Sequence, residues 1–184
     1  DLHSFPTRRS SDLLVSMNSM FSGAANLESV DVSSFRVDNV LDMGSMFADC
    51  SSLANLDLSK YASRKIVKIS SMFINCKSLK TLKLDTFLTT EVEDMTNLFY
   101  SCTSLTSLNL TSFNTKKVTK MDRMFYKCES LTELVINTFD TSSLVQMDEM
   151  FYGVKALTSL DISNFNTKKV ETMENLFYEC ESLK

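Results

Sequence analysis

The sequence repeats every 26 residues, and this period constrains the possible folds more than any other feature. Leucine recurs at this interval without an insertion, at Leu27, Leu53, Leu79, Leu105, Leu131, Leu157 and Leu183. One unit reads LTSLNLTSFNTKKVTKMDRMFYKCES at residues 105–130, and six complete units cover residues 27–182. Such a chain is expected to fold as an array of stacked units, in which each unit contacts only its neighbours.

The rarer apolar residues follow the same period. All eleven methionines fall at two positions of the repeat, and every phenylalanine except Phe5 falls at two others. Replacements at these positions stay apolar, such as Ile69 for methionine and Tyr61 for phenylalanine. Because packing requires apolar side chains at equivalent places in every unit, these positions are predicted to form the core.

Each unit predicts a short strand and then a short helix. In L-x-x-L-x-L, the two-residue alternation places Leu108 and Leu110 on one face of a strand. A polar turn follows, and the apolar residues after it are Val118, Met121, Met124, Phe125 and Cys128. Their spacing of 3, 3, 1 and 3 is typical of one face of a helix.

These elements predict an α/β fold, a right-handed solenoid of short parallel strands and short helices. Parallel strands lie about 4.8 Å apart, whereas packed helices need roughly 8–10 Å. The strand side is therefore expected to be concave and the helix side convex. The alternative is a parallel β-helix with a second strand in place of the helix, which would need a two-residue alternation after the turn. The sequence shows no such alternation there.

The repeat register begins at Leu14. We interpret residues 14–184 as a single solenoid domain, with a partial unit at 14–26, six units at 27–182 and a truncated seventh at 183–184. Residues 3–13, HSFPTRRSSDL, look like the translation of a sequencing-library adapter. We therefore interpret residues 1–13 as non-native and expect them to be disordered. The chain is expected to be a fragment of a longer array.

The repeat region lacks the residue types that catalysis and metal binding usually need. The single histidine lies in the segment 1–13, so no histidine base accompanies a serine or cysteine nucleophile. The three glycines form no phosphate-binding loop, and no C-x-x-C pair occurs. The sequence therefore predicts no enzymatic activity, no cofactor and no metal site.

Charge and cysteine placement exclude further classes. A net charge of −4 gives no basic surface for nucleic acid, and no run of 18 apolar residues is present for membrane insertion. The five cysteines occupy one repeat position, where Val154 also occurs, so we predict buried free thiols and not a disulfide ladder.

A tyrosine column follows the core phenylalanine, at Tyr100, Tyr126, Tyr152 and Tyr178. Half-exposed packing is the favoured interpretation of this column, with recognition by an aromatic stripe as the alternative.

Two columns of side chains point outward from the predicted strands. They are the candidate binding residues, on the face expected to be concave: Ser29, Asp31, Asn55, Asp57, Thr81, Lys83, Ser107, Asn109, Glu133, Val135, Ser159 and Asp161. Most of these side chains are small and polar, which suits a broad protein or glycan surface. They include few aromatic or arginine anchors, so weak binding multiplied over many repeats is the expected mechanism.

The pattern L-x-x-L-x-L followed by F-x-T-x-x-V-x-x-M-x-x-M-F-Y-x-C resembles the BspA-like leucine-rich repeat, in the 26-residue form of bacterial surface proteins. The resemblance covers residues 14–184 and is strongest at 114–128 and 166–180. It implies a leucine-rich-repeat solenoid from a cell-surface or secreted protein of the adhesion type, which binds host or extracellular matrix proteins or neighbouring cells. It transfers no binding residue, because the motif consists of core positions.

The sequence therefore predicts a non-enzymatic adhesion module that binds a protein or glycan ligand through the strand side. One alternative is an intracellular scaffold built from the same repeats, with a cytoplasmic location. Another is a rigid spacer for domains elsewhere in the full-length protein. A signal peptide, a lipoprotein cysteine or a wall-anchoring tail in the complete gene would separate the surface protein from the scaffold.

Overall fold

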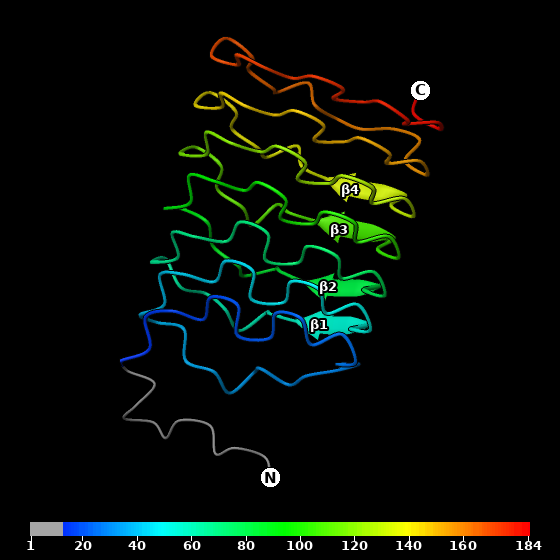
Figure 1. The fold of residues 1–184 in the computed structure, drawn as a ribbon. Helices are drawn as coiled ribbons and strands as arrows, with labels where there is room; N and C mark the ends of the chain where they lie inside the picture. Colours follow the sequence, from blue (N-terminus) through cyan, green and yellow to red (C-terminus); the bar gives the residue numbers. More distant parts are fainter. Residues whose placement is uncertain (1–12) are drawn as a thin grey trace.

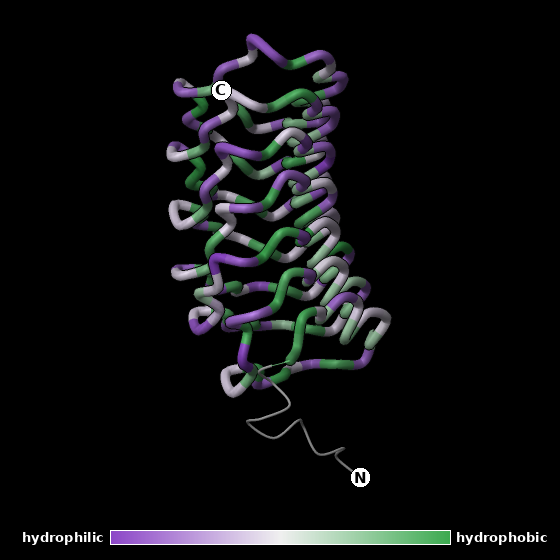
Figure 2. Tube along the Cα trace, turned by 90° about the vertical axis from the view of Figure 1, so that its left-hand side faces the viewer, coloured by the Kyte–Doolittle hydropathy of each residue, from purple (hydrophilic) through white to green (hydrophobic). Residues whose placement is uncertain are grey.

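The structure is a computed structural model that describes residues 13–184, and the chain there winds into a column of stacked coils (Figure 1). The first described residues and the C terminus lie at opposite ends of this column (Figure 1). Hydrophobic segments recur at the same place in successive coils and lie one above the other (Figure 2). The predicted non-native segment falls outside the described residues, except for the exposed Leu13.

Four short strands lie on one side of the column: β1 (Asn55–Asp57), β2 (Thr81–Lys83), β3 (Ser107–Asn109) and β4 (Glu133–Val135). Strand β1 pairs in parallel with β2, and β3 pairs in parallel with β4. The register joins residues 26 apart, such as Leu108 with Leu134. In β3 the central leucine is buried between two exposed residues, as the alternation predicts.

The predicted helix is wrong, because no helix occurs within residues 13–184. The segment after the polar turn is instead a run of tight turns in which every fourth residue has a positive φ, such as 54° at Arg123 and 53° at Lys127. An α-helix requires a negative φ at every residue, so these left-handed positions interrupt it.

Backbone hydrogen bonds in this segment alternate between two kinds of partner. The N–H groups of Met121 and Phe125 donate to the next coil, at Gln146 O and Met150 O, both at 2.9 Å. The Met124 N–H donates within its own coil, to Met121 O at 3.2 Å. Because these bonds satisfy the backbone without an i to i−4 ladder, the segment does not need to become helical.

A second parallel ladder replaces the expected layer of helices. It consists of isolated bridges between successive coils, which join Ser16 to Asp42, Asp42 to Lys68, Asp94 to Lys120, Lys120 to Gln146 and Gln146 to Thr172. Backbone hydrogen bonds therefore join neighbouring coils on the turn side as well as on the strand side, where β1 pairs with β2 and β3 with β4. The wide spacing of helices, on which the expected concave strand side depended, is absent.

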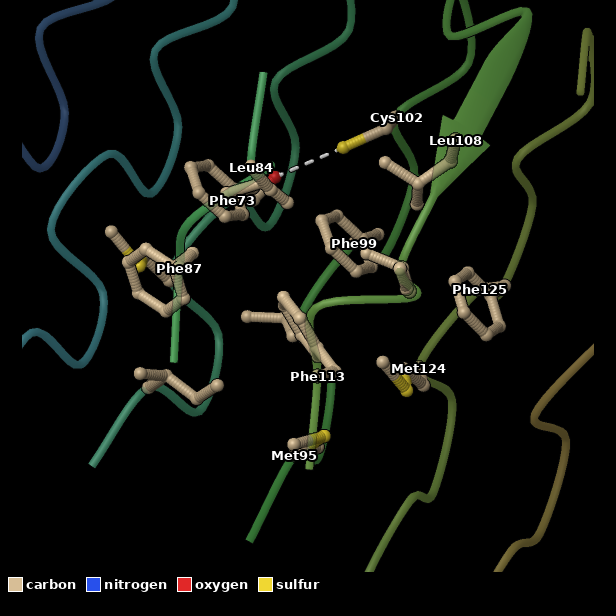
Figure 3. Close-up of a cluster of buried hydrophobic side chains, with 14 of the residues drawn as sticks. Phe73, Leu84, Phe87, Met95, Phe99, Cys102, Leu108, Phe113, Met124 and Phe125 are labelled. Atoms are coloured by element: carbon tan, nitrogen blue, oxygen red, sulfur yellow. Dashed lines mark hydrogen bonds between the residues drawn. The ribbon is translucent and has the colours of Figure 1, made fainter. Parts of the chain in front are cut away.

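The apolar columns form one continuous core. Rings at the second phenylalanine position stack coil upon coil, with centroids 5.5 Å apart for Phe73 and Phe99 and 5.6 Å apart for Phe99 and Phe125 (Figure 3). Nine of the eleven methionines are buried, and the two exposed ones, Met20 and Met173, lie in the terminal coils. Burial of large side chains at roughly 1.5–3 kcal/mol each makes these columns the main stabilising feature.

Candidate binding surface

The predicted binding residues lie together on one surface, which we call the strand face. It comprises two columns: Ser29, Asn55, Thr81, Ser107, Glu133 and Ser159 in one, and Asp31, Asp57, Lys83, Asn109, Val135 and Asp161 in the other. All twelve are exposed except Val135, which is half-buried. Within the strand pairs β1–β2 and β3–β4, equivalent residues of adjacent coils pair directly, as Asn55 does with Thr81.

In each column, a hydrogen bond joins the side chains of β1 and β2. The Thr81 hydroxyl donates to Asn55 Oδ1 at 2.5 Å, and Lys83 Nζ donates to Asp57 Oδ2 at 3.0 Å. The Lys83–Asp57 ion pair is exposed on both sides, so it contributes little to stability. Its effect is to hold one positive and one negative group at a fixed separation on the strand face.

The second column also shapes the backbone. The Oδ1 atoms of Asp31 and Asp57 accept hydrogen bonds from the N–H groups two residues later, those of Ser33 and Ser59, both at 2.9 Å. Asn109 does the same for Thr111 at 3.0 Å, and Asp161 for Ser163 at 3.1 Å. These side-chain turns end the strand, so the column is both a surface feature and a structural one.

The same hydrogen bonds fix the charge of this column. Hydrogen bonds from Ser59 have the largest effect on Asp57 and the Lys83 ammonium adds a smaller one, and together they lower the pKa of Asp57 from 3.8 to about 2. Hydrogen bonds from Ser33 lower the pKa of Asp31, and those from Ser163 lower the pKa of Asp161. These carboxyls therefore stay negative at neutral and mildly acidic pH.

Two open hollows lie on the strand face. The larger, about 450 Å³, is lined among others by Asp31, Asp57, Lys60 and Lys83, and so presents carboxylates beside ammonium groups. The smaller, about 260 Å³, lies between the fourth strand and the coil after it, and Asp161 is among its lining residues. Within residues 13–184, no group of three or more His, Cys, Asp or Glu side chains could hold a metal ion.

The five cysteines are unlinked, as predicted, and four of them are buried. Cys50, Cys76, Cys102 and Cys128 are buried free thiols, and Cys180 is half-buried. Each thiol donates to the carbonyl of the phenylalanine 29 residues earlier, as Cys102 Sγ does to Phe73 O at 3.2 Å (Figure 3). Burial raises the pKa of Cys76 and of Cys128 to about 12, so neither thiol is a nucleophile at neutral pH.

This burial predicts how the thiols react. With an excess of a thiol-reactive disulfide reagent, we expect Cys180 to react quickly in the folded protein and the four buried thiols to react only as the coils open. The absorbance of the released thiol measures this, and the chain in denaturant, where all five should react at once, is the control. Rapid reaction of two or more thiols in the folded protein would contradict the buried column.

The sequence patterns did not predict one column of buried polar side chains. Thr89, Thr115 and Thr141 are buried, each two residues after a core phenylalanine. The Thr115 hydroxyl donates to Asp140 O at 3.0 Å in the next coil and accepts from the Asp140 N–H at 2.7 Å. These threonines therefore fasten the polar turns of adjacent coils together. The F-x-T spacing was the available signal, but a polar residue beside a turn is usually exposed.

A known family matches nearly the whole chain. The family described as "Mycoplasma protein of unknown function, DUF285" matches residues 10–108 and 93–184. No curated protein matches the chain.

Three solved structures share the fold. A leucine-rich repeat protein from Eubacterium ventriosum is 19% identical with a TM-score of 0.53, and the match covers 83% of this chain and 36% of that one. A leucine-rich cell-surface protein from Faecalibacterium prausnitzii is 25% identical with a TM-score of 0.55, covering 80% and 36%. A leucine-rich repeat protein from Bacteroides ovatus is 19% identical with a TM-score of 0.52, covering 94% and 46%.

These matches confirm the resemblance to BspA-like leucine-rich repeats. The chain spans less than half the length of each of the three solved proteins. Among residues 13–184, no helix is long and apolar enough to cross a membrane.

Proposed function

The chain belongs to the family described as "Mycoplasma protein of unknown function, DUF285", and on that premise we propose that it is a non-enzymatic adhesion module of a cell-surface or secreted protein. It binds a protein or glycan ligand, of host, matrix or neighbouring-cell origin, through the strand face. The fold alone does not determine the ligand, because leucine-rich repeats present different side chains on one scaffold.

The observation that carries the proposal is the arrangement of the strand face. Its two columns stand on a backbone held by the strand pairs β1–β2 and β3–β4 and by the side-chain turns at Asp31, Asp57, Asn109 and Asp161. Both hollows lie on this face. A rigid surface of repeated polar groups loses little entropy when a ligand binds, and several weak contacts then act together.

A cell-surface location is also part of the proposal. The solved relative from Faecalibacterium prausnitzii is described as a leucine-rich cell-surface protein. The hollows on the strand face are broad and open. This shape suits a large partner outside the cell better than a small molecule, which usually binds in a deep pocket.

The test removes charge from the strand face without removing its turns. Asn109 shows that asparagine also accepts the backbone N–H at this position. The variant Asp31→Asn, Asp57→Asn, Asp161→Asn therefore keeps the turns and loses three negative charges. The matched control is Glu93→Gln, Glu129→Gln, Glu171→Gln, which removes the same charge from exposed positions outside the strand face.

Binding is measured against immobilised extracellular-matrix proteins, a glycan panel and intact cells. We expect the parent chain and the control to bind alike and the strand-face variant to bind about tenfold more weakly, as the loss of three exposed charge contacts implies. Equal binding by the parent and the strand-face variant would exclude these carboxylates, and absence of binding by the parent would exclude adhesion.

A further inference from the structure

The tyrosine column forms a continuous stack on the surface of the solenoid. Tyr100, Tyr126, Tyr152 and Tyr178 each follow a core phenylalanine, so their rings point away from the core. Adjacent ring centroids are 4.6, 4.7 and 5.0 Å apart along the stack. The interplanar angle is 7° for the first pair and widens to 21° and 26° for the next two.

The rings of this stack are accessible from solvent. Tyr100, Tyr126 and Tyr152 are half-buried, and Tyr178 is 55% exposed. Tyr61 differs, because it replaces phenylalanine at the other phenylalanine position of the repeat and is fully buried there. Its hydroxyl donates to Val32 O at 3.4 Å. The chain therefore contains four tyrosines that a dissolved oxidant can reach and, as an internal control, one that it cannot.

Local charges distinguish members of the stack. The Tyr152 hydroxyl donates to Glu179 Oε1 at 3.3 Å, so a carboxylate stands ready to accept its proton. Lys127 Nζ lies 5.5 Å from the centroid of the Tyr126 ring, where a positive charge opposes the loss of an electron. Of these two rings, Tyr152 is the easier to oxidise.

We propose that this column is an oxidative cross-linking site, at which a one-electron oxidant such as a haem peroxidase with hydrogen peroxide joins tyrosines of adjacent coils. The preferred links are Tyr126–Tyr152 and Tyr152–Tyr178. A dityrosine bond at either place staples two coils together along the solenoid axis and leaves the strand face untouched.

The overall reaction consumes only the two phenols and one hydrogen peroxide, and Glu179 serves as a temporary proton acceptor. Each phenol gives up one electron and one proton, and the proton of Tyr152 goes to Glu179. The two phenoxyl radicals combine to form one carbon–carbon bond between their ortho carbons. The two ortho hydrogens then leave as protons while the two oxygens regain protons, which restores both aromatic rings. The two electrons and two protons released overall reduce one hydrogen peroxide to two waters.

The stacking favours coupling within one chain. Neighbouring rings are held close together, which gives them a high effective concentration relative to tyrosines of other molecules. Bond formation requires the rings to turn out of their parallel stack, and all four side chains are at least partly exposed to solvent. The two pairs that already deviate most from parallel both contain Tyr152.

The experiment treats the dilute chain with a haem peroxidase and hydrogen peroxide. We expect dityrosine fluorescence to develop while the protein stays monomeric on a denaturing gel. Mass spectrometry of a digest should find peptides containing Tyr152 joined to those containing Tyr126 or Tyr178, with the loss of two hydrogens. Tyr152→Phe keeps an aromatic ring in the stack and should lower the yield roughly threefold or more, whereas Tyr61→Phe should leave it unchanged.

Three results would overturn the proposal. The first is a cross-link found only between different chains. The second is an equal yield from the chain unfolded in denaturant at the same concentration. The third is an equal yield from Tyr152→Phe and Tyr61→Phe, both shown by circular dichroism to be folded.

Discussion

Phe99→Ala is expected to lower the free energy of unfolding by about 3–5 kcal/mol, the usual cost of removing a large aromatic side chain from a core. Phe99 is fully buried and stacks on Phe73 of the preceding coil and on Phe125 of the following coil (Figure 3). The alanine would leave a cavity in the middle of the ring column, where the backbone ladders on both sides of the coil hold the walls apart. Denaturant unfolding followed by circular dichroism measures the loss.

The matched control is Phe177→Ala, at the same repeat position in the last coil. Phe177 is half-buried and stacks on Phe151 alone among the rings of its column within residues 13–184. Because less contact is lost and the end of the array can relax, we expect roughly half the effect of Phe99→Ala or less. A loss below about 1 kcal/mol for Phe99→Ala, or equal losses for both variants, would contradict a continuous core.

Ser101→Pro is expected to destabilise the protein by about 3 kcal/mol or more. Ser101 has a φ of 55°, whereas proline fixes φ near −65°. Its N–H also donates to Tyr126 O at 2.7 Å in the next coil, and proline has no N–H to replace this bond. The midpoint of denaturant unfolding measures the effect.

The companion variant Ser101→Gly tests the turn geometry by the direction in which it changes the stability. Gly23 and Gly153 already occupy this repeat position with positive φ. A left-handed conformation costs a residue with a side chain roughly 1–2 kcal/mol, and glycine avoids this cost. Glycine is also more flexible in the unfolded chain, which offsets part of the gain in stability. Stability should therefore stay the same or rise by up to about 1 kcal/mol. If residue 101 lay in a helix, the same substitution would instead lower the stability by a few tenths of a kcal/mol.

The strands and the core were predictable because both depend on which side chains are apolar. Leu108 and Leu110 alternate around an exposed asparagine, and the structure buries both leucines. The tight turns that take the place of the predicted helix were not predictable from the same information. Two consecutive tight turns bury Met121, Met124 and Cys128 at intervals close to those of a helix face. The difference lies in the sign of φ at Arg123 and Lys127, residue types that do not favour a left-handed backbone.

The surface was predicted in part. Alternation alone placed the two columns of the strand face outward, and their exposure agrees with this. The structural role of the second column was missed, although a signal was present. Asp or Asn is followed two residues later by Ser or Thr at 31–33, 57–59, 109–111 and 161–163, and these residues are typical of side-chain turns. Binding through this face remains a proposal.

The central claim is that equivalent positions stack at intervals of 26 residues. Deleting residues 105–130 joins Ser104 to Leu131 and removes one whole coil, so every remaining column stays in register. Deleting residues 105–117 removes half a coil and misaligns the leucine, methionine and phenylalanine columns. Denaturant unfolding of the two variants is the most direct test. We predict a cooperative transition near that of the parent for the 26-residue deletion and loss of cooperative unfolding for the 13-residue deletion. Equal behaviour of the two variants would contradict the stacked-coil account.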